Sequence, residues 1–138
     1  MKDKIFVLIK KAALEFDKLS IPLFAPYELT PSQYKILRLL YIEEPETIRQ
    51  IDIEKSFSMT NPTVTGLLHN LEKKDWIQRI PNPNDSRSKV IRLTAKAEGL
   101  REELLEISDR LEDMLTDNLN NQEKEQLIEL MNKMLKKE

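Results

Sequence analysis

The chain has 138 residues, of which 40% are hydrophobic, 33% charged and 6% aromatic, and its formal net charge is −2. This length predicts one domain with its own hydrophobic core, and the composition excludes a disordered chain and a membrane protein. The sequence has no cysteine and a single histidine, His69, which excludes disulfides, thiol catalysis and a cysteine- or histidine-rich metal site. Because the amphipathic start of the chain has no small-residue cleavage site after it, we expect a cytoplasmic protein without a signal peptide.

The charge is distributed unevenly along the chain. Residues 60–94 carry six basic and three acidic side chains, whereas residues 95–138 carry seven basic and twelve acidic ones. A basic middle segment followed by an acidic tail indicates a polyanionic partner for the middle segment alone.

An amphipathic helix is predicted over residues 5–19. Its main apolar stripe recurs at steps of three and four residues and consists of Ile5, Leu8, Ile9, Ala12, Phe16 and Leu19. Further apolar residues widen this surface, so we expect the helix to bury two faces.

Two short helices are predicted next, each from a Thr-x-x-Gln capping box at its start. Thr30 and Gln33 form the first box, and Thr47 and Gln50 repeat the spacing. The segment Glu43–Glu46 contains a proline and ends the first of these helices.

A further helix is predicted over about residues 61–74, with Asn61 as its cap and Pro62 in its first turn. One narrow apolar face is formed by Val64, Leu67, Leu68 and Leu71. The opposite face and its edges are small or polar: Pro62, Thr63, Thr65, Gly66, His69, Asn70 and Lys73. Such a face allows close approach to base edges and offers hydrogen bonds to DNA. A polar surface helix without a ligand is the alternative.

A two-stranded hairpin is predicted from the alternating segments 76–80 and 90–93. Asp85 and Arg87 lie at its glycine-free tip, with Lys89 behind them. An arginine on a protruding loop suits the negative potential of a narrow minor groove, and Asp85 is expected to hold it by a charge-assisted pair. The alternative is a hairpin whose mixed charges keep it soluble.

Two more helices complete the chain. Thr94 caps a long charged helix with a heptad seam of Leu100, Leu104, Ile107, Leu111 and Met114. After Asn120 and Asn121, a last helix is predicted over residues 122–137, with an inward face of Leu127, Leu130, Met131 and Met134.

Three short helices followed by a hairpin predict a winged helix-turn-helix, mainly α with a small β-hairpin. The succession LTPSQYKIL, DIEKSFSMTNPTVTGLLHNLEKKDWI and DSRSKVIRLT resembles the MarR family of bacterial transcription regulators over essentially the whole chain. Two positions depart from the family pattern, because Asp75 and Ala97 stand where members often have glycine. A left-handed backbone at Asp75 would cost more than at glycine.

The resemblance implies a homodimer that binds a palindromic operator, acts as a repressor and needs no cofactor. The single domain of residues 1–138 would then comprise a DNA-binding lobe of about residues 30–94 and dimerisation helices of about 2–20 and 95–138. The implied DNA contacts are Thr60, Asn61, Pro62, Thr63, Thr65, Gly66, His69, Asn70, Lys73, Arg87 and Lys89, with Asp85 as the support of Arg87 in a wing of residues 81–90. The implied dimer interface comprises Ile5, Leu8, Ile9, Leu111, Met114, Leu127, Leu130, Met131 and Met134.

The family also implies release from DNA by a small aromatic or anionic ligand. Here its pocket would be lined by Phe16, Phe24, Tyr27, Tyr34 and Leu37, and ordinary core packing of these residues is the favoured alternative. A winged-helix protein-interaction module is the second reading of the function. An enzyme is not expected, because the sequence offers no nucleophile–base pair, metal cluster or phosphate-binding loop.

Overall fold

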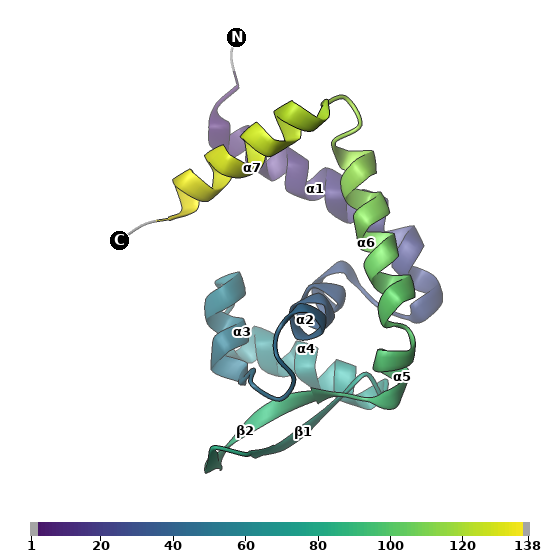
Figure 1. The fold of residues 1–138 in the computed structure, drawn as a ribbon, viewed down its shortest axis with the longest axis vertical. Helices are drawn as coiled ribbons and strands as arrows, with labels where there is room; N and C mark the ends of the chain where they lie inside the picture. Colours follow the sequence, from purple (N-terminus) through teal and green to yellow (C-terminus); the bar gives the residue numbers. More distant parts are fainter. Residues whose placement is uncertain (1–2, 137–138) are drawn as a thin grey trace.

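The computed structural model describes residues 3–136 and confirms a mainly helical fold with one small hairpin (Figure 1). In Figure 1 the hairpin and three short helices occupy one end, and the first and last helices occupy the other. The elements in chain order are α1 Ile5–Phe24, the 3-10 helix η1 Ala25–Tyr27, α2 Pro31–Ile42, α3 Gln50–Phe57, α4 Asn61–Lys73, β1 Ile77–Asn82, β2 Asp85–Leu93, α5 Ala95–Gly99, α6 Arg101–Leu115 and α7 Asn121–Leu135.

Helix α1 continues past the predicted end at Leu19 and contains Pro22. A proline in a helix removes one backbone N–H donor, but the Ala25 N–H still donates to the Ile21 carbonyl, and the chain passes directly into η1. The turn ends at Glu28, whose left-handed φ of 57° stops the helical hydrogen bonding.

The N-terminus of α2 confirms the first predicted capping box. The Thr30 hydroxyl oxygen accepts from the Gln33 backbone N–H at 3.2 Å, and the Gln33 side-chain oxygen accepts from the Thr30 N–H at 3.1 Å. These two bonds satisfy donors that a helix start leaves free.

The caps of the next two helices differ from the prediction. Helix α3 is capped at Arg49, where the Asp52 carboxylate accepts from the Arg49 N–H at 2.9 Å, and Thr47 instead donates to the Glu44 carbonyl at 2.8 Å. An ionised carboxylate accepts more strongly than an amide oxygen, which favours Asp52 as the capping partner. Helix α4 is capped by Thr60, one residue before the predicted Asn61.

The hairpin is longer than predicted. Its antiparallel register pairs Ile77 with Leu93 and Ile80 with Val90, and an irregularity occurs between Pro81 and Asn82. Proline is tolerated because a two-stranded sheet has only edge strands, which need no N–H donor on their outer side.

The core lies where α2, α4, the hairpin and α6 meet. The predicted inner face of α4 is confirmed, since Val64, Leu68 and Leu71 are completely buried. Two buried tyrosines tie the lobe to the C-terminal helices, because Tyr41 donates to the Ala97 carbonyl at 2.6 Å and Tyr34 to the Leu104 carbonyl at 3.1 Å.

The predicted long helix after Thr94 is divided at Leu100 into α5 and α6. Helix α6 packs on α1 of the same chain, and the seam residues Leu104 and Leu111 are completely buried, whereas Met114 is exposed. Leu111 therefore differs from the prediction, because it has no surface for a dimer partner to cover. Helix α7 begins at Asn121, and the predicted end at Lys137 lies outside the described residues.

Within residues 3–136, no helix combines the length and the apolar character needed to cross a membrane.

Candidate nucleic-acid interface

Helix α4 presents the predicted polar face to solvent. Gly66 lies in the middle of this face, and a Cβ atom added there would meet no atom within 4 Å. Packing inside the chain therefore does not require glycine, whereas a surface that approaches α4 closely would benefit from it. The exposed residues on this face and its edges are Asn61, Pro62, Thr63, Thr65, Gly66, His69, Asn70 and Lys73.

The first turn of α4 is held by hydrogen bonds among its own threonines. The Thr60 hydroxyl oxygen accepts from the Thr63 backbone N–H at 3.4 Å, and the Thr60 hydroxyl donates to the Thr63 side-chain oxygen at 2.9 Å. The N-terminus of a helix carries partial positive charge, so this turn suits contact with an anion such as a phosphate.

Two residues of the α4 face are bonded to side chains of α3. The Asn61 side-chain N–H donates to the Glu54 carboxylate, and the Gln50 side-chain N–H donates to the Thr65 hydroxyl oxygen, both at 2.9 Å. Arg79 of β1 in turn donates to the Gln50 side-chain oxygen at 3.3 Å. These contacts were not predicted from the sequence, since neither Gln50, Glu54 nor Arg79 shares a periodic face with α4.

The tip of the hairpin contains the predicted pair. One carboxylate oxygen of Asp85 accepts from both the backbone N–H and the side-chain Nε of Arg87, each at 3.1 Å. These bonds, the side-chain one first, lower the pKa of the Asp85 carboxyl below its ordinary value. The Arg87 side chain is 90% exposed, so its guanidinium is tethered on one side and open on the other. Lys89 is also exposed.

The turn at this tip is ordered by side chains of its own. The Asn84 backbone N–H donates to the Asn82 side-chain oxygen at 3.0 Å, and the Asn82 side-chain N–H donates to the Ser88 hydroxyl oxygen at 3.1 Å. Asparagine can form such local turns where the chain has no glycine.

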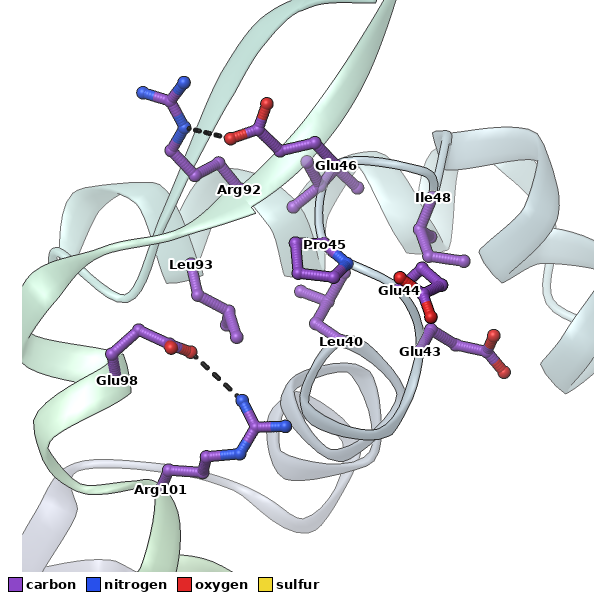
Figure 2. Close-up of a pocket in the computed structure, with 11 residues that line it drawn as sticks. Leu40, Glu43, Glu44, Pro45, Glu46, Ile48, Arg92, Leu93, Glu98 and Arg101 are labelled. Carbon is purple, nitrogen blue, oxygen red and sulfur yellow. Dashed lines mark hydrogen bonds and ion pairs between the residues drawn. The ribbon is translucent and has the colours of Figure 1, made fainter.

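A pocket of about 300 Å³ lies between the segment after α2, the end of β2 and the start of α6 (Figure 2). Figure 2 shows ion pairs on two sides of it, from Arg92 to Glu46 at 3.0 Å and from Arg101 to Glu98 at 3.2 Å. Four of its lining side chains are glutamates and two are arginines, so this surface disfavours a polyanion.

Three of the five residues predicted to line an effector pocket are buried in the core. Phe24 and Tyr34 are buried and stacked with ring centroids 4.2 Å apart, and Leu37 is completely buried in the same core. The Tyr27 hydroxyl donates to Glu103 on α6. Phe16 lines a pocket of about 260 Å³ against α6 and α7. The burial of Phe24, Tyr34 and Leu37 agrees with the alternative of core packing, and an effector pocket at these residues stays a prediction.

Helices α1 and α7, which lie at the end opposite the hairpin (Figure 1), carry large exposed apolar side chains. Among the residues predicted for the dimer interface, the exposed ones are Ile5, Leu8, Ile9, Met114, Leu127, Leu130 and Met134, whereas Met131 is half-buried. Among residues 3–136, no group of three or more histidine, aspartate or glutamate side chains is arranged to hold a metal ion.

Known proteins are similar to this chain in both sequence and fold. The model of the MarR family matches residues 29–89. The multiple antibiotic resistance protein MarR of Escherichia coli is 30% identical over 120 residues, which cover 86% of this chain and 82% of that protein. The transcriptional regulator MgrA of Staphylococcus aureus is 31% identical over 112 residues, which cover 81% and 74%.

Two similar crystal structures contain DNA. The S. aureus MepR–DNA complex has a TM-score of 0.84 and 31% identity, and the match covers 97% of this chain and 98% of that one. A mutant of E. coli MarR complexed with operator DNA has a TM-score of 0.83 and 28% identity over 96% and 94% of the two chains. With this identity over most of both sequences, the chain belongs to the MarR family of winged-helix transcriptional regulators.

Proposed function

We propose that the chain acts in the cytoplasm as a homodimeric repressor that binds a palindromic DNA operator. Membership of the MarR family makes it a DNA-binding winged-helix regulator, and two relatives of known structure are bound to DNA. The observation that carries the proposal for this chain is the wing tip, where Asp85 tethers Arg87 while the guanidinium stays open to solvent.

The proposal assigns the polar face of α4 to the major groove. Small residues around Gly66 allow close approach, His69 and Asn70 offer hydrogen bonds to base edges, and Lys73 offers charge to a phosphate. The first turn of the helix, from Thr60 to Thr63, offers its backbone and hydroxyl groups to the DNA.

The proposal assigns the wing, residues 81–90, to the adjacent minor groove. Arg87 enters the groove, where negative potential is strongest, and Lys89 contacts the backbone. Asp85 supports Arg87, because a side chain that is already oriented loses less freedom on binding.

Dimerisation uses the exposed apolar side chains of α1 and α7. Leu8 and Leu130 are large, apolar and exposed in one chain, and a second copy would cover them. The lobe of residues 30–94 then reads one half-site, and the helices of residues 2–20 and 95–138 join the two lobes. Two lobes double the phosphate contacts of one, which strengthens binding and makes it sensitive to salt.

Two other readings are less well supported. A protein-interaction module without DNA binding is not favoured, because relatives of this chain are solved with DNA. Release by a small aromatic or anionic ligand stays a prediction, and the side chains first expected to bind the ligand pack in the core.

The replacement Arg87→Ala tests the function. We expect it to weaken operator binding about tenfold or more at constant salt, since it removes the charge placed in the minor groove. Arg110→Ala, an equal loss of charge on the exposed side of α6, is the control and should leave affinity nearly unchanged. Equal affinities for Arg87→Ala and the original chain, at unchanged melting temperature and dimer mass, would contradict the proposal.

A further inference from the structure

A chain of hydrogen bonds connects strand β1 to α4 through α3. The Glu72 carboxylate accepts from Arg79 Nε at 3.1 Å, and Arg79 Nη1 donates to the Gln50 side-chain oxygen at 3.3 Å. The Gln50 Nε2 then donates to the Thr65 hydroxyl oxygen at 2.9 Å. Three secondary-structure elements thus contribute to one continuous network, which ends on the face assigned to DNA.

The chemistry of Arg79 fixes the direction of every bond in this network. A guanidinium can only donate, so the group of Gln50 that faces it must be the amide oxygen. The amide NH₂ of Gln50 therefore faces Thr65 and donates to it. The Glu54 carboxylate, 3.3 Å from the same nitrogen, can only accept and favours the same orientation.

The bond from Gln50 occupies one lone pair of the Thr65 hydroxyl oxygen on the side of α3, so the group acts toward the outside first through its proton. Its oxygen already accepts from Gln50, and no acceptor within residues 3–136 takes its proton. Because Thr65 is exposed on α4, the hydroxyl proton is free for a group outside the chain. Thr65 is thereby prepared as a hydrogen-bond donor.

The side-chain amide of Asn61 is oriented so that it offers an acceptor, where Thr65 offers a donor. Its side-chain NH₂ donates to the Glu54 carboxylate at 2.9 Å, and a carboxylate cannot act as the donor in this bond. The amide oxygen of Asn61 therefore stays free as an acceptor. One face of α4 thus presents a donor at Thr65 and an acceptor at Asn61, both set by side chains of α3.

We propose that this network sets the base preference of the protein, with Gln50 and Arg79 as positioning residues that act through Thr65. The proposal rests on the DNA-binding function and adds the residues that determine its specificity. A donor at Thr65 favours guanine O6 or N7, adenine N7 or thymine O4, and disfavours the amino group of cytosine. The oxygen of Asn61 favours the amino groups of adenine or cytosine.

The test compares base preferences and not overall affinities. Competition binding with operators changed at one base pair at a time gives the preference at every position of the half-site. Thr65→Val keeps the shape of the side chain but removes the hydroxyl, so it should remove a preference of up to about tenfold at one base pair per half-site. That base pair identifies the position that Thr65 reads.

Gln50→Met keeps the length of the side chain and removes the amide. We expect it to weaken the base preference at the base pair identified with Thr65→Val, because the Thr65 hydroxyl can then donate or accept. The base preferences at the other positions should not change. Gln50→Glu should shift the same preference toward bases with an amino group. A carboxylate at position 50 would accept the Thr65 hydroxyl proton, so the lone pairs of the Thr65 oxygen would face the DNA. Arg79→Met releases the Gln50 amide from β1 and should therefore weaken the base preference at the same position.

Melting temperatures show whether each variant folds, and Arg79→Met supplies the test if a Gln50 variant does not. If Gln50→Met and Arg79→Met leave the preference at the Thr65 position unchanged, or lower it equally at every position, the inference is wrong. Failure of the original chain to bind any DNA would instead overturn the proposed function. The two failures are therefore distinguishable.

Discussion

A single carboxylate oxygen of Asp85 accepts two hydrogen bonds from Arg87, one from the backbone N–H and one from Nε, each 3.1 Å long. This arrangement places an acidic residue at the tip of a wing assigned to a polyanion. Asp85 orients the arginine, but its negative charge also repels the DNA phosphates. The net effect of Asp85 on operator binding depends on which of these two effects is larger.

Asp85→Ala should weaken operator binding roughly three- to tenfold, because the loss of two hydrogen bonds frees the Arg87 side chain. Charge alone predicts the reverse, since the replacement removes repulsion from DNA. Glu44→Ala is the matched control: this exposed glutamate lies in the same lobe, and its loss should leave binding unchanged or slightly tighter. Tighter binding of Asp85→Ala, measured by fluorescence anisotropy, would show that Asp85 does not support Arg87.

The same pair predicts a pH dependence. Arg87 lowers the pKa of the Asp85 carboxyl below its ordinary value of 3.8. The ion pair is therefore fully formed above this ordinary value and is lost as the pH falls through the lowered pKa. The effect of Asp85→Ala on affinity should therefore be constant between about pH 6 and pH 8. In an NMR titration, the Asp85 carboxyl carbon should have a midpoint below 3.8, and Arg87→Ala should raise it toward 3.8. A midpoint at or above 3.8 in the original chain contradicts the pair.

A replacement at Asp75 tests how backbone strain affects the free energy of unfolding. Asp75 has a left-handed φ of 66° at the turn from α4 into the hairpin, a backbone conformation that favours glycine. Asp75→Gly should raise the free energy of unfolding by roughly 0.5–1 kcal/mol, as relief of the left-handed strain exceeds the added freedom of the unfolded chain. The hydrogen bond from Thr94 to the Asp75 carbonyl, 2.7 Å long, is retained.

The control for this prediction is Asp109→Gly in the helical backbone of α6, which should lower the free energy of unfolding. Both variants are unfolded in denaturant at one protein concentration, since dimerisation contributes to stability. Destabilisation of Asp75→Gly by as much as the control would show that the turn is not strained.

Much of the fold was predictable because its signals are local. The buried face of α4 follows from the spacing of Val64, Leu68 and Leu71, and the start of α2 follows from the Thr30 capping box. The family resemblance indicated Asp75 as a position where a left-handed backbone would be costly, and its φ is 66°. Each of these features depends on residues within one turn or one helix.

The features that were missed depend on residues distant in sequence. A heptad seam has the same spacing whether it packs on a partner or on α1, so the sequence could not show that Leu111 is buried within one chain. Aromatic residues at a junction suit a pocket or a core equally, and Phe24 and Tyr34 stack in the core. The contact of Gln50 with Arg79 joins residues 29 positions apart and needs the folded hairpin.

Leu130→Glu tests the assignment of α7 to the dimer. Leu130 is 63% exposed in one chain, and a carboxylate there would be buried without a partner if a second copy covers it. We expect the dimer to dissociate at concentrations at least about tenfold higher than for the original chain, as measured by sedimentation. Gln126→Glu adds the same charge on the same helix and should have a much smaller effect. A dimer equally stable in both variants places the interface elsewhere.

Selection of bound sites from random DNA with the purified protein tests the central claim most directly. A dimer with one α4 in each half-site predicts an enriched inverted repeat whose half-sites are centred one helical turn apart, roughly 10 base pairs. Recovery of an unrepeated half-site, or of no enriched sequence even at low salt, would contradict a dimeric operator-binding regulator.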